Sequence, residues 1–415
     1  MNENSTKGQE IDLAKFNQLG INTKVKSFPA FYESGLLNNI DEKFLTDVHV
    51  YWKKYYREEK NPAEHPFYTA YMNFTGDKDP RIVSPTIMSK EIVPYLNDPK
   101  MREAYSDKNI YDILLDTQRT TELVLKRVYE TYYDAKNNYL SRESAYQQLK
   151  DYASDLIIKP SKTDDGEGIE KLTYHNKELY IDEKKVSMQE IEEIYGGHFI
   201  VQKVVEQHDI MAAPHPSSVN TLRVVTLRWK GKVRYLLTFA RFGVNQSVKD
   251  NAGAGGICLG VTDTGEFYNV AVDSNCKRYT HHPTTNYRFA DLPPIPNFSE
   301  FKEFAIELHN QILHHDFVSW DIIVGKDSKP IFLEANFKGA VWLYQLATER
   351  PLFGDLTEEI LQHIGSEIDS RRSSRTKVIK EEEKRKQELS RLRRKVRKLR
   401  RKNKQLRTKL NESND

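Results

Sequence analysis

The chain is poor in cysteine and has no long apolar run. Cys258 and Cys276 are its two cysteines, too few for a disulfide framework and without the spacing of a metal site. No stretch approaches the roughly 18 apolar residues of a membrane span. The first residues, MNENSTKGQEIDLAK, have neither the basic nor the apolar region of a signal peptide. We therefore expect free thiols and a cytoplasmic protein.

The charge is unevenly distributed, although the formal net charge is only +3. Residues 371–410 contain 20 Lys and Arg against 4 Glu, so residues 1–370 carry a net charge of −11. An acidic body argues against binding of nucleic acid and confines any contact with a polyanion to the tail. The length of 415 residues favours two or three domains.

The tail has the spacing of a short coiled coil over residues 370–412. Its apolar seam contains a lone Asn403, which favours two parallel strands. Arg and Lys occupy the flanking positions, however, and would repel in a parallel homodimer. We expect the tail to become ordered on an acidic partner helix or on an anionic membrane surface, which would make the protein peripheral at a membrane. The alternative, a nucleic-acid-binding region, lacks a base-reading pattern.

The segment VSWDIIVGKDSKPIFLEAN, residues 318–336, predicts a β-hairpin. Its two apolar strands flank a turn rich in Gly, Asp, Ser and Pro. In the expected register Ile322 faces Leu333. The same register places Asp321 directly opposite Glu334.

Three oxygen-bearing side chains then converge, because the two-residue period of a strand sets Asn336 on the face of Glu334. Facing carboxylates in apolar strands repel, so a positive group is needed between them. Mg²⁺ prefers oxygen ligands and completes its shell with water and phosphates. Asp321, Glu334 and Asn336 are therefore candidate metal ligands. The alternative is a surface hairpin whose acids face water.

A second candidate site is the predicted strand DLIIKP, in which Lys159 precedes a loop with Gly166 and Gly168. A lysine at the end of a strand can reach phosphates, and a glycine loop can fold its N–H groups over them. The loop reads TDDGEG, and its three acids oppose a bound polyanion. Either these acids point outward or nucleotide binding is impaired.

Two arginines lie within apolar predicted strands, Arg223 in residues 220–229 and Arg241 in residues 233–242. An arginine in such a strand is paired either with a fixed carboxylate or with a bound phosphate. The following segment, KDNAGAGGICLG, predicts a loop that approaches the site closely, with Asp250 at its mouth.

The motifs QKVVEQH, HPSSVNTLRVVT, RFG, KDNAGAGGI, HHP, WDIIV and FLEAN occur in this order. Together they resemble the sugar-transfer-associated ATP-grasp family, and the resemblance covers residues 202–345. It implies an α+β fold with a helical N-terminal region (residues 1–104) and an ATP-grasp domain (residues 105–366). The basic coiled coil of residues 370–412 would form a separate C-terminal helix.

The resemblance also implies roles for individual residues. Lys108, in YSDKNIYDILL, stands as the first nucleotide-binding lysine. HFIVQKVVEQH stands as the hinge strand: the backbone of Lys203 and Val204 would pair with adenine, while Gln202 and Glu206 approach the amino group and the ribose. On the same grounds, bound phosphate is favoured over a structural ion pair for the two arginines, which with Asp250 are the candidate catalytic residues.

The implied cofactors are ATP and Mg²⁺. The implied reaction is attack of a small-molecule carboxylate on the γ-phosphoryl group, giving an acyl phosphate that an amine or other nucleophile opens. The family name places such a ligase in the synthesis of cell-surface polysaccharide or glycoconjugate. Two alternatives stay open: a non-catalytic scaffold that binds nucleotide or sugar and is recruited by its coiled coil, and a small-molecule kinase.

Overall fold

The computed structural model describes residues 27–56, 65–163, 168–245, 255–339 and 341–370. The chain forms two compact units, one of residues 1–52 and 61–357, the other of residues 53–60 and 358–415. In the second unit residues 358–370 are helical. Gly166, Asp250 and the predicted coiled coil lie outside the described residues.

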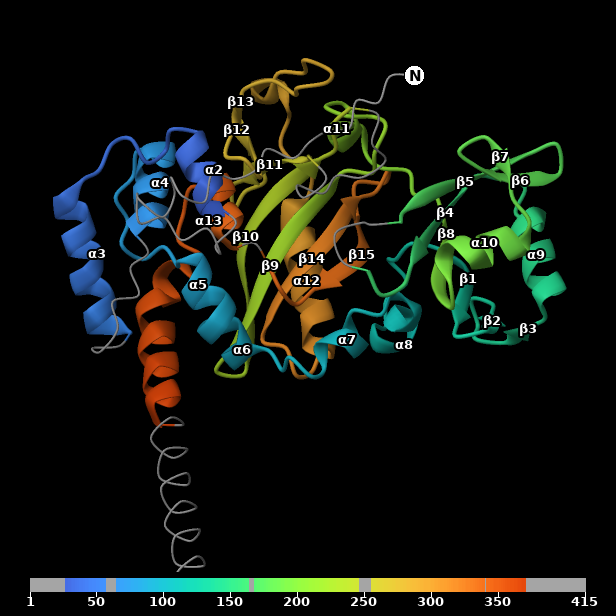
Figure 1. Ribbon diagram of the computed structural model, residues 1–415, viewed down its shortest axis with the longest axis horizontal. Coiled ribbons are helices and arrows are strands. Elements are labelled where there is room, and N and C mark those ends of the chain that lie inside the picture. The colour runs from blue at the N-terminus through green and yellow to red at the C-terminus, as the bar shows by residue number, and fades with distance from the viewer. Residues whose placement is uncertain (1–26, 57–64, 164–167, 246–254, 340, 371–415) are drawn as a thin grey trace, which may run out of the picture. The chain divides into compact units, whose positions relative to one another are not determined.

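The first elements that the structure describes in this unit are helices (Figure 1). The longest of them is amphipathic: Phe44, Val48 and Trp52 recur on one face of α3 and are buried. The helices of this region are α2 (Ser27–Glu33), α3 (Glu42–Tyr55), α4 (His65–Thr75), α5 (Pro85–Ile87), the π-helix η1 (Met88–Ile92), α6 (Val93–Leu96) and α7 (Arg102–Tyr105). The 3₁₀ turn η2 (Lys108–Ile110) and α8 (Tyr111–Leu114) lead into the first sheet.

The first sheet is antiparallel, with the strand order β3-β2-β1-β8-β4-β5-β6-β7. Two helices supply the rest of its apolar core, α9 (Arg142–Asp151) and α10 (Met188–Tyr195). The second of these starts at a capping box formed by Ser187 and Glu190. The strands are β1 (Leu123–Val128), β2 (Thr131–Tyr133), β3 (Tyr139–Leu140), β4 (Leu156–Pro160), β5 (Glu170–His175), β6 (Glu178–Ile181), β7 (Lys184–Lys185) and β8 (His198–Lys203).

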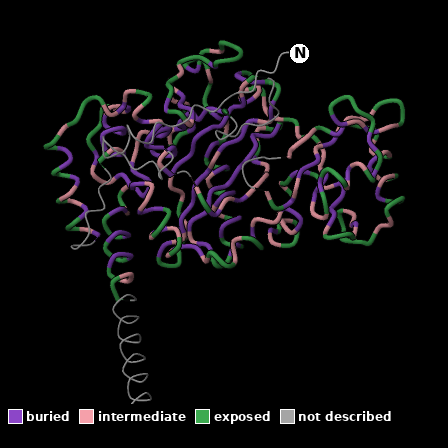
Figure 2. The backbone as a smooth tube through the Cα atoms, in the orientation of Figure 1, coloured by how far each residue is buried: buried purple, intermediate pink, exposed green. Residues whose placement is uncertain are grey.

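The second sheet is also antiparallel, in the order β13-β12-β11-β10-β9-β14-β15. Helix α12 (Phe298–Gln311) packs on β9 and β10, and α13 (Val341–Thr348) packs on β10 and β11. Buried residues run along the strands (Figure 2). The remaining elements are α11 (Asp209–Ala212), β9 (Thr221–Trp229), β10 (Lys232–Phe242), β11 (Ile257–Val261), β12 (Phe267–Asp273), β13 (Arg278–Tyr279), η4 (Phe289–Asp291), β14 (Phe317–Val324), β15 (Pro330–Asn336) and η5 (Gly354–Leu356).

The predicted hairpin is present as β14 and β15. Asp321 faces Glu334 across it, as expected. The rest of the register was predicted wrongly, because Ile322 faces Phe332 and not Leu333. A bulge between Asp321 and Ile322 shifts the pairing by one residue.

Each sheet has its own apolar core, and the α+β class expected from the sequence is confirmed. The two sheets meet along the chain that connects them. The amide of Phe332 in β15 donates to the carbonyl of Arg119, just before β1, and the amide of His208, just after β8, donates to the carbonyl of Val324 in β14. These two hydrogen bonds join the segments beside β1 and β8 to the two strands of the hairpin.

Asn97 attaches the helical region to the hairpin. Its side-chain amide donates to the carbonyls of Phe317 (2.8 Å) and Phe337 (3.0 Å) and accepts from the amide of Phe317 (2.9 Å). The segment that follows Asn97 is therefore held at the ends of β14 and β15. None of the helices in the described part of the chain has the length and apolarity needed to cross a membrane.

Candidate functional site

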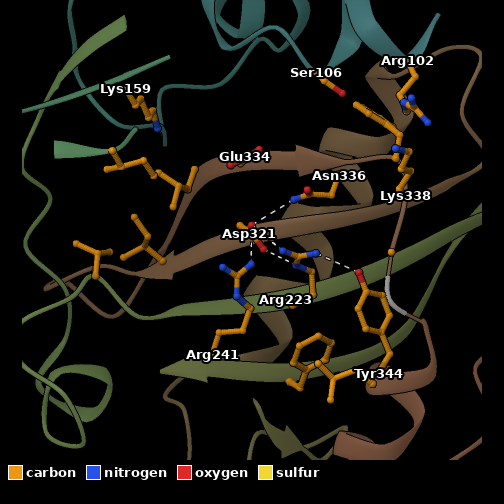
Figure 3. Close-up of a pocket in the computed structure, with 18 of the residues that line it drawn as sticks. Arg102, Ser106, Lys159, Arg223, Arg241, Asp321, Glu334, Asn336, Lys338 and Tyr344 are labelled. Atoms are coloured by element: carbon orange, nitrogen blue, oxygen red, sulfur yellow. Dashed lines mark hydrogen bonds and ion pairs between the residues drawn. The ribbon is translucent and has the colours of Figure 1, made fainter. Parts of the chain in front are cut away.

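A cavity of about 550 Å³ lies where the two sheets face each other (Figure 3). Its walls come from three places in the chain. The first sheet contributes Lys159, Gln202 and Lys203; the second contributes Arg223, Arg241, Asp321, Glu334 and Asn336; the helical region contributes Asn97, Asp98, Arg102 and Ser106. The residues that line this cavity are thus spread over the sequence from Ser89 to Tyr344.

Lys159 is a buried cation at the end of β4, with 4% of its surface exposed. No ion pair of Lys159 is present among the described residues. Its pKa is lowered to about 8, chiefly by burial and also by the nearby charge of Lys108, against the opposite effect of Glu334 and Asp321. A desolvated lysine that faces a cavity without a carboxylate partner is suited to an anionic ligand.

Asp321 is held by three side chains. The guanidinium of Arg223 donates to both of its oxygens, at 2.5 Å and 3.0 Å, and Arg241 donates at 3.1 Å. The amide of Asn336 donates at 3.2 Å. Burial acts to raise the pKa of Asp321, but the charges of the two arginines outweigh it and hold the pKa below its ordinary value. The carboxylate is therefore ionised and fully engaged.

Glu334 forms an ion pair with Lys108. The Nζ atom of Lys108 lies 3.2 Å from its Oε1 and donates to the carbonyl of Thr163 at 2.8 Å. The sequence argument required a positive group between the facing acids, and the chain itself supplies it: Lys108 pairs with Glu334 and the two arginines pair with Asp321. Their repulsion is thus no longer an argument for a metal.

Arg223 and Arg241 both face a fixed carboxylate, the alternative that the sequence reasoning had favoured less. Both also line the cavity. Arg223 donates in addition to the hydroxyl oxygen of Tyr344 at 3.0 Å, which fixes its orientation. The two guanidinium groups are therefore oriented at the cavity wall by protein contacts alone.

The predicted hinge is placed in part at the cavity. Gln202 and Lys203 line it, together with Val205. Val204 and Glu206 are exposed and do not line it. Gln202 donates to the hydroxyl of Thr121 at 2.5 Å.

Of the loop TDDGEG the structure describes the first residue, Thr163, and the last, Gly168. Gly168 has φ +72°, and a Cβ there would lie 2.8 Å from the Cγ atom of Pro160. A larger residue would therefore clash with the end of β4. The next residue, Ile169, lines the cavity.

The sequence reasoning missed several residues of this cavity. Arg102 and Ser106 come from the helical region, to which no chemistry was assigned, and Tyr344 comes from α13. Lys338 lies two residues after the FLEAN motif. Its closeness to this motif could have identified Lys338 as a site residue. Arg102 had no such signal, because it lies more than 200 residues away from the hairpin in sequence.

The hairpin offers oxygen donors of the kind that Mg²⁺ prefers. The amide of Asn336 points its nitrogen at Asp321, which leaves its oxygen on the other side. The ion pair of Glu334 with Lys108 is made through its Oε1 atom. No group of three His, Cys, Asp or Glu residues that would hold a metal occurs in the described ranges. The donors fit magnesium in kind, with two carboxylates and one amide.

The profile of sugar-transfer associated ATP-grasp proteins matches residues 87–361, about two thirds of the chain. The chain belongs to this ATP-grasp family. The match starts within the region 1–104, so the matched residues include Arg102. No curated protein matches the chain.

Among solved structures, the ATP-grasp chain is similar to an L-amino acid ligase from Bacillus licheniformis, with 12% identity and a TM-score of 0.35. That match covers 63% of this chain and 48% of the ligase. It is also similar to the D-alanine-D-alanine ligase from Coxiella burnetii, with 11% identity, a TM-score of 0.35 and coverage of 66% and 62%. The VanG D-Ala:D-Ser ligase from Enterococcus faecalis matches with 14% identity, a TM-score of 0.35 and coverage of 62% and 60%. The chain thus spans about half to three fifths of the length of these ligases.

Proposed function

We propose that this ATP-grasp chain is an ATP- and Mg²⁺-dependent, ADP-forming ligase that activates a carboxylate as an acyl phosphate. Membership of a family associated with sugar transfer supports a role in the synthesis of cell-surface polysaccharide or glycoconjugate. The observation that carries the proposal is Lys159, a buried cation without an ion pair among the described residues, at the wall of a cavity between two sheets.

The nucleotide would lie with its phosphates at Lys159. A phosphate there would give the ammonium group of Lys159 an anionic partner in place of the water that burial removes. Gln202 and Lys203 line the same part of the cavity and would contact the base. We propose that Arg223 and Arg241 act at the transferred phosphoryl group from the wall of the second sheet.

Glu334 and Asn336 would hold magnesium, with Asp321 as a third ligand. A bound magnesium ion supplies charge neutralisation between phosphates. Lys108 and the two arginines already balance the acids, so the protein keeps its donors in place without the metal. The oxygens of Glu334 and Asn336 are thus held at the site in advance, whereas Asp321 would exchange a hydrogen bond from Arg223 or Arg241 for the metal.

In the proposed reaction one carboxylate oxygen of the substrate attacks the γ-phosphorus, and the bond from that phosphorus to the β-bridging oxygen breaks. ADP leaves with the bridging electrons. An amine or other nucleophile then attacks the acyl carbon and expels inorganic phosphate, losing a proton. The chain's task is to position the two reactants and to offset charge on the moving phosphoryl group, because such transfer needs no side-chain nucleophile.

One observation favours a second candidate, a nucleotide-binding scaffold without catalysis. Every carboxylate of the hairpin already has a cationic partner from the chain, so the site is electrostatically complete without metal. A small-molecule kinase would use the same phosphate-binding groups.

A screen of ATP consumption with sugar acids and amino acids separates these functions. The ligase requires ADP release that depends on both a carboxylate and a nucleophile, with a product whose mass equals the two joined minus water. A phosphorylated product would instead show a kinase. Binding of ATP without any consumption across the screen would favour the scaffold.

A further inference from the structure

We propose that the end of the cavity formed by Arg102, Ser106 and Lys338 is a second anion-binding site, which takes an anionic group, phosphate or carboxylate, of the substrate that is joined. The inference rests on the proposed function only in assigning the Lys159 end of the cavity to the nucleotide. The inference adds a class of substrate: molecules that carry an anionic group in addition to the group that reacts.

Arg102 and Lys338 come from distant parts of the chain, but α7 and the segment after β15 that carry them are in contact. We call these two segments the platform. Arg102 is in α7, and Tyr105 of the same helix packs edge-on against Phe337, with ring centroids 5.9 Å apart. Lys338 directly follows Phe337. Asn97 ties this platform to β14 through its hydrogen bonds to Phe317. The packing of Tyr105 against Phe337 therefore holds together the two segments that bear the cations.

The platform lies apart from the groups assigned to the nucleotide. Figure 3 shows Arg102, Ser106 and Lys338 together on one side of the cavity, with Lys159 on the other side. Glu334 and Asn336 lie between these two groups (Figure 3). A molecule bound at the Arg102 end would thus approach the hairpin from the side opposite to Lys159.

The balance of charge at this end favours an anion. Among the described residues neither Arg102 nor Lys338 forms an ion pair. Arg102 is half-buried and Lys338 is exposed, so both can meet a ligand. Asp98 is the acid that the described residues contribute to this part of the wall, and its carboxylate accepts from the amide of Lys100 at 2.9 Å.

The neighbouring histidine adds no charge. His315 is buried against Tyr105 and Phe337, and its two ring nitrogens have no hydrogen-bond partner among the residues that the structure describes. The pKa of His315 is lowered to about 4, chiefly by burial and also by the charges of His314 and Arg102, against the opposite effect of Asp98. At neutral pH the site therefore carries two positive charges against one negative charge, with the hydroxyl of Ser106 as a further donor.

Titration of the full chain with inorganic phosphate tests this site by calorimetry, with and without saturating Mg-ADP. The variants are Arg102→Gln, Lys338→Gln and the double variant. Lys100→Gln is the matched control, because Lys100 is exposed, lies two residues from Arg102 and does not line the cavity. A parallel titration with acetate asks whether the site takes a carboxylate as well as a phosphate.

We expect phosphate to bind the Mg-ADP complex, with an affinity that falls about tenfold in Arg102→Gln, a few-fold in Lys338→Gln and not at all in Lys100→Gln. The affinity for Mg-ADP should stay within about twofold of the original in all of them. Unchanged phosphate and acetate binding in the double variant would overturn the inference. A parallel loss of Mg-ADP affinity would also overturn it, since the two cations would then belong to the nucleotide site.

The proposed function can fail separately. If Mg-ADP does not bind the original chain, the assignment of the Lys159 end falls. The titration without nucleotide still tests the Arg102 end, because phosphate bound there should respond to Arg102→Gln and not to Lys159→Met.

Discussion

At the scale of single residues, Lys159 combines a cost to stability with a use in binding. The wild-type chain buries this ammonium group without a paired acid among the described residues, and its pKa falls from 10.5 to about 8. Such a fall corresponds to a loss of folding free energy on the order of 3 kcal/mol, at about 1.4 kcal/mol for each pKa unit. A residue kept at such a cost is a good candidate for function.

Lys159→Met should therefore make the ligand-free protein more stable and its nucleotide complex weaker. At pH 7 we expect the free energy of unfolding to rise by about 2 to 3 kcal/mol, and the binding free energy of ATP to fall by about 1 to 3 kcal/mol. Chemical denaturation and calorimetry measure the two effects. Lys232→Met, at an exposed position in β10, is the control and should change neither. A variant that lost stability without losing affinity would contradict the assignment.

The same residue predicts a pH dependence. Because the pKa of Lys159 is lowered on folding, the unfolded chain holds an extra proton between pH 8 and 10.5, and wild-type stability rises with pH across this interval. Bound phosphate raises the pKa again, so nucleotide binding above pH 8 should take up as much as one proton. Calorimetry at pH 9 in two buffers of different ionisation enthalpy measures the uptake. Equal proton uptake by wild type and Lys159→Met would show that another group titrates.

The chemistry of single residues was readable from the sequence where a motif was local. Lys159 at the end of a strand and the facing pair Asp321 and Glu334 needed only strand periodicity. The partners of these residues were not readable, since Lys108 and Glu334 lie 226 positions apart and no local pattern links them.

At the scale of elements, the hairpin carries the proposed metal ligands. Glu334→Gln keeps the shape and an oxygen that can accept from Lys108, so we expect stability to fall by only about 1 kcal/mol. The dependence of nucleotide binding on Mg²⁺ should be lost, and ADP release should fall by about a hundredfold or more. Titration of ADP with and without Mg²⁺ reports the first effect, with Glu303→Gln in α12 as the exposed control. Unaltered Mg²⁺ dependence would remove Glu334 from the metal site.

A second element-scale prediction concerns Asn97, which connects the helical region to the hairpin. Asn97→Ala removes three hydrogen bonds and leaves buried backbone groups of Phe317 and Phe337 without partners. We expect the free energy of unfolding to fall by about 3 kcal/mol. Asn310→Ala, at an exposed position of α12, should leave it unchanged. If the two variants have the same free energy of unfolding, Asn97 does not stabilise the contact between the helical region and the hairpin.

The elements were predicted well and their details less so. The hairpin was predicted over residues 318–336 and runs from Phe317 to Asn336, because apolar runs flanked by turn residues are strong local signals. The bulge after Asp321 was missed, since nothing in the sequence of either strand marks the extra residue.

At the scale of the whole molecule, an acidic body is joined to a basic tail. Residues 371–410 carry 20 basic and 4 acidic side chains, whereas the chain as a whole carries +3. The α+β fold with an ATP-grasp domain followed from the family resemblance, while the contribution of the helical region to the cavity did not. Contacts between segments far apart in sequence are set by tertiary packing, which no local pattern reports.

A peptide of residues 381–410 should be poorly helical at low ionic strength and gain helix on anionic vesicles. The lysines and arginines beside its apolar seam repel in a parallel pair, and polybasic residues gain about 1 kcal/mol each at an anionic surface. Circular dichroism and sedimentation measure both properties. A stable homodimer that ignores vesicles would show an ordinary dimerisation coiled coil instead.

The central claim is that this chain forms an acyl phosphate, and the fate of one oxygen atom tests it most directly. The carboxylate identified by the consumption screen is labelled with ¹⁸O, and the mass of the released phosphate is measured after turnover with ATP and the nucleophile. Attack of the carboxylate on the γ-phosphorus predicts one ¹⁸O atom in each phosphate released. Unlabelled phosphate, or label retained in a phosphorylated substrate, would contradict the account.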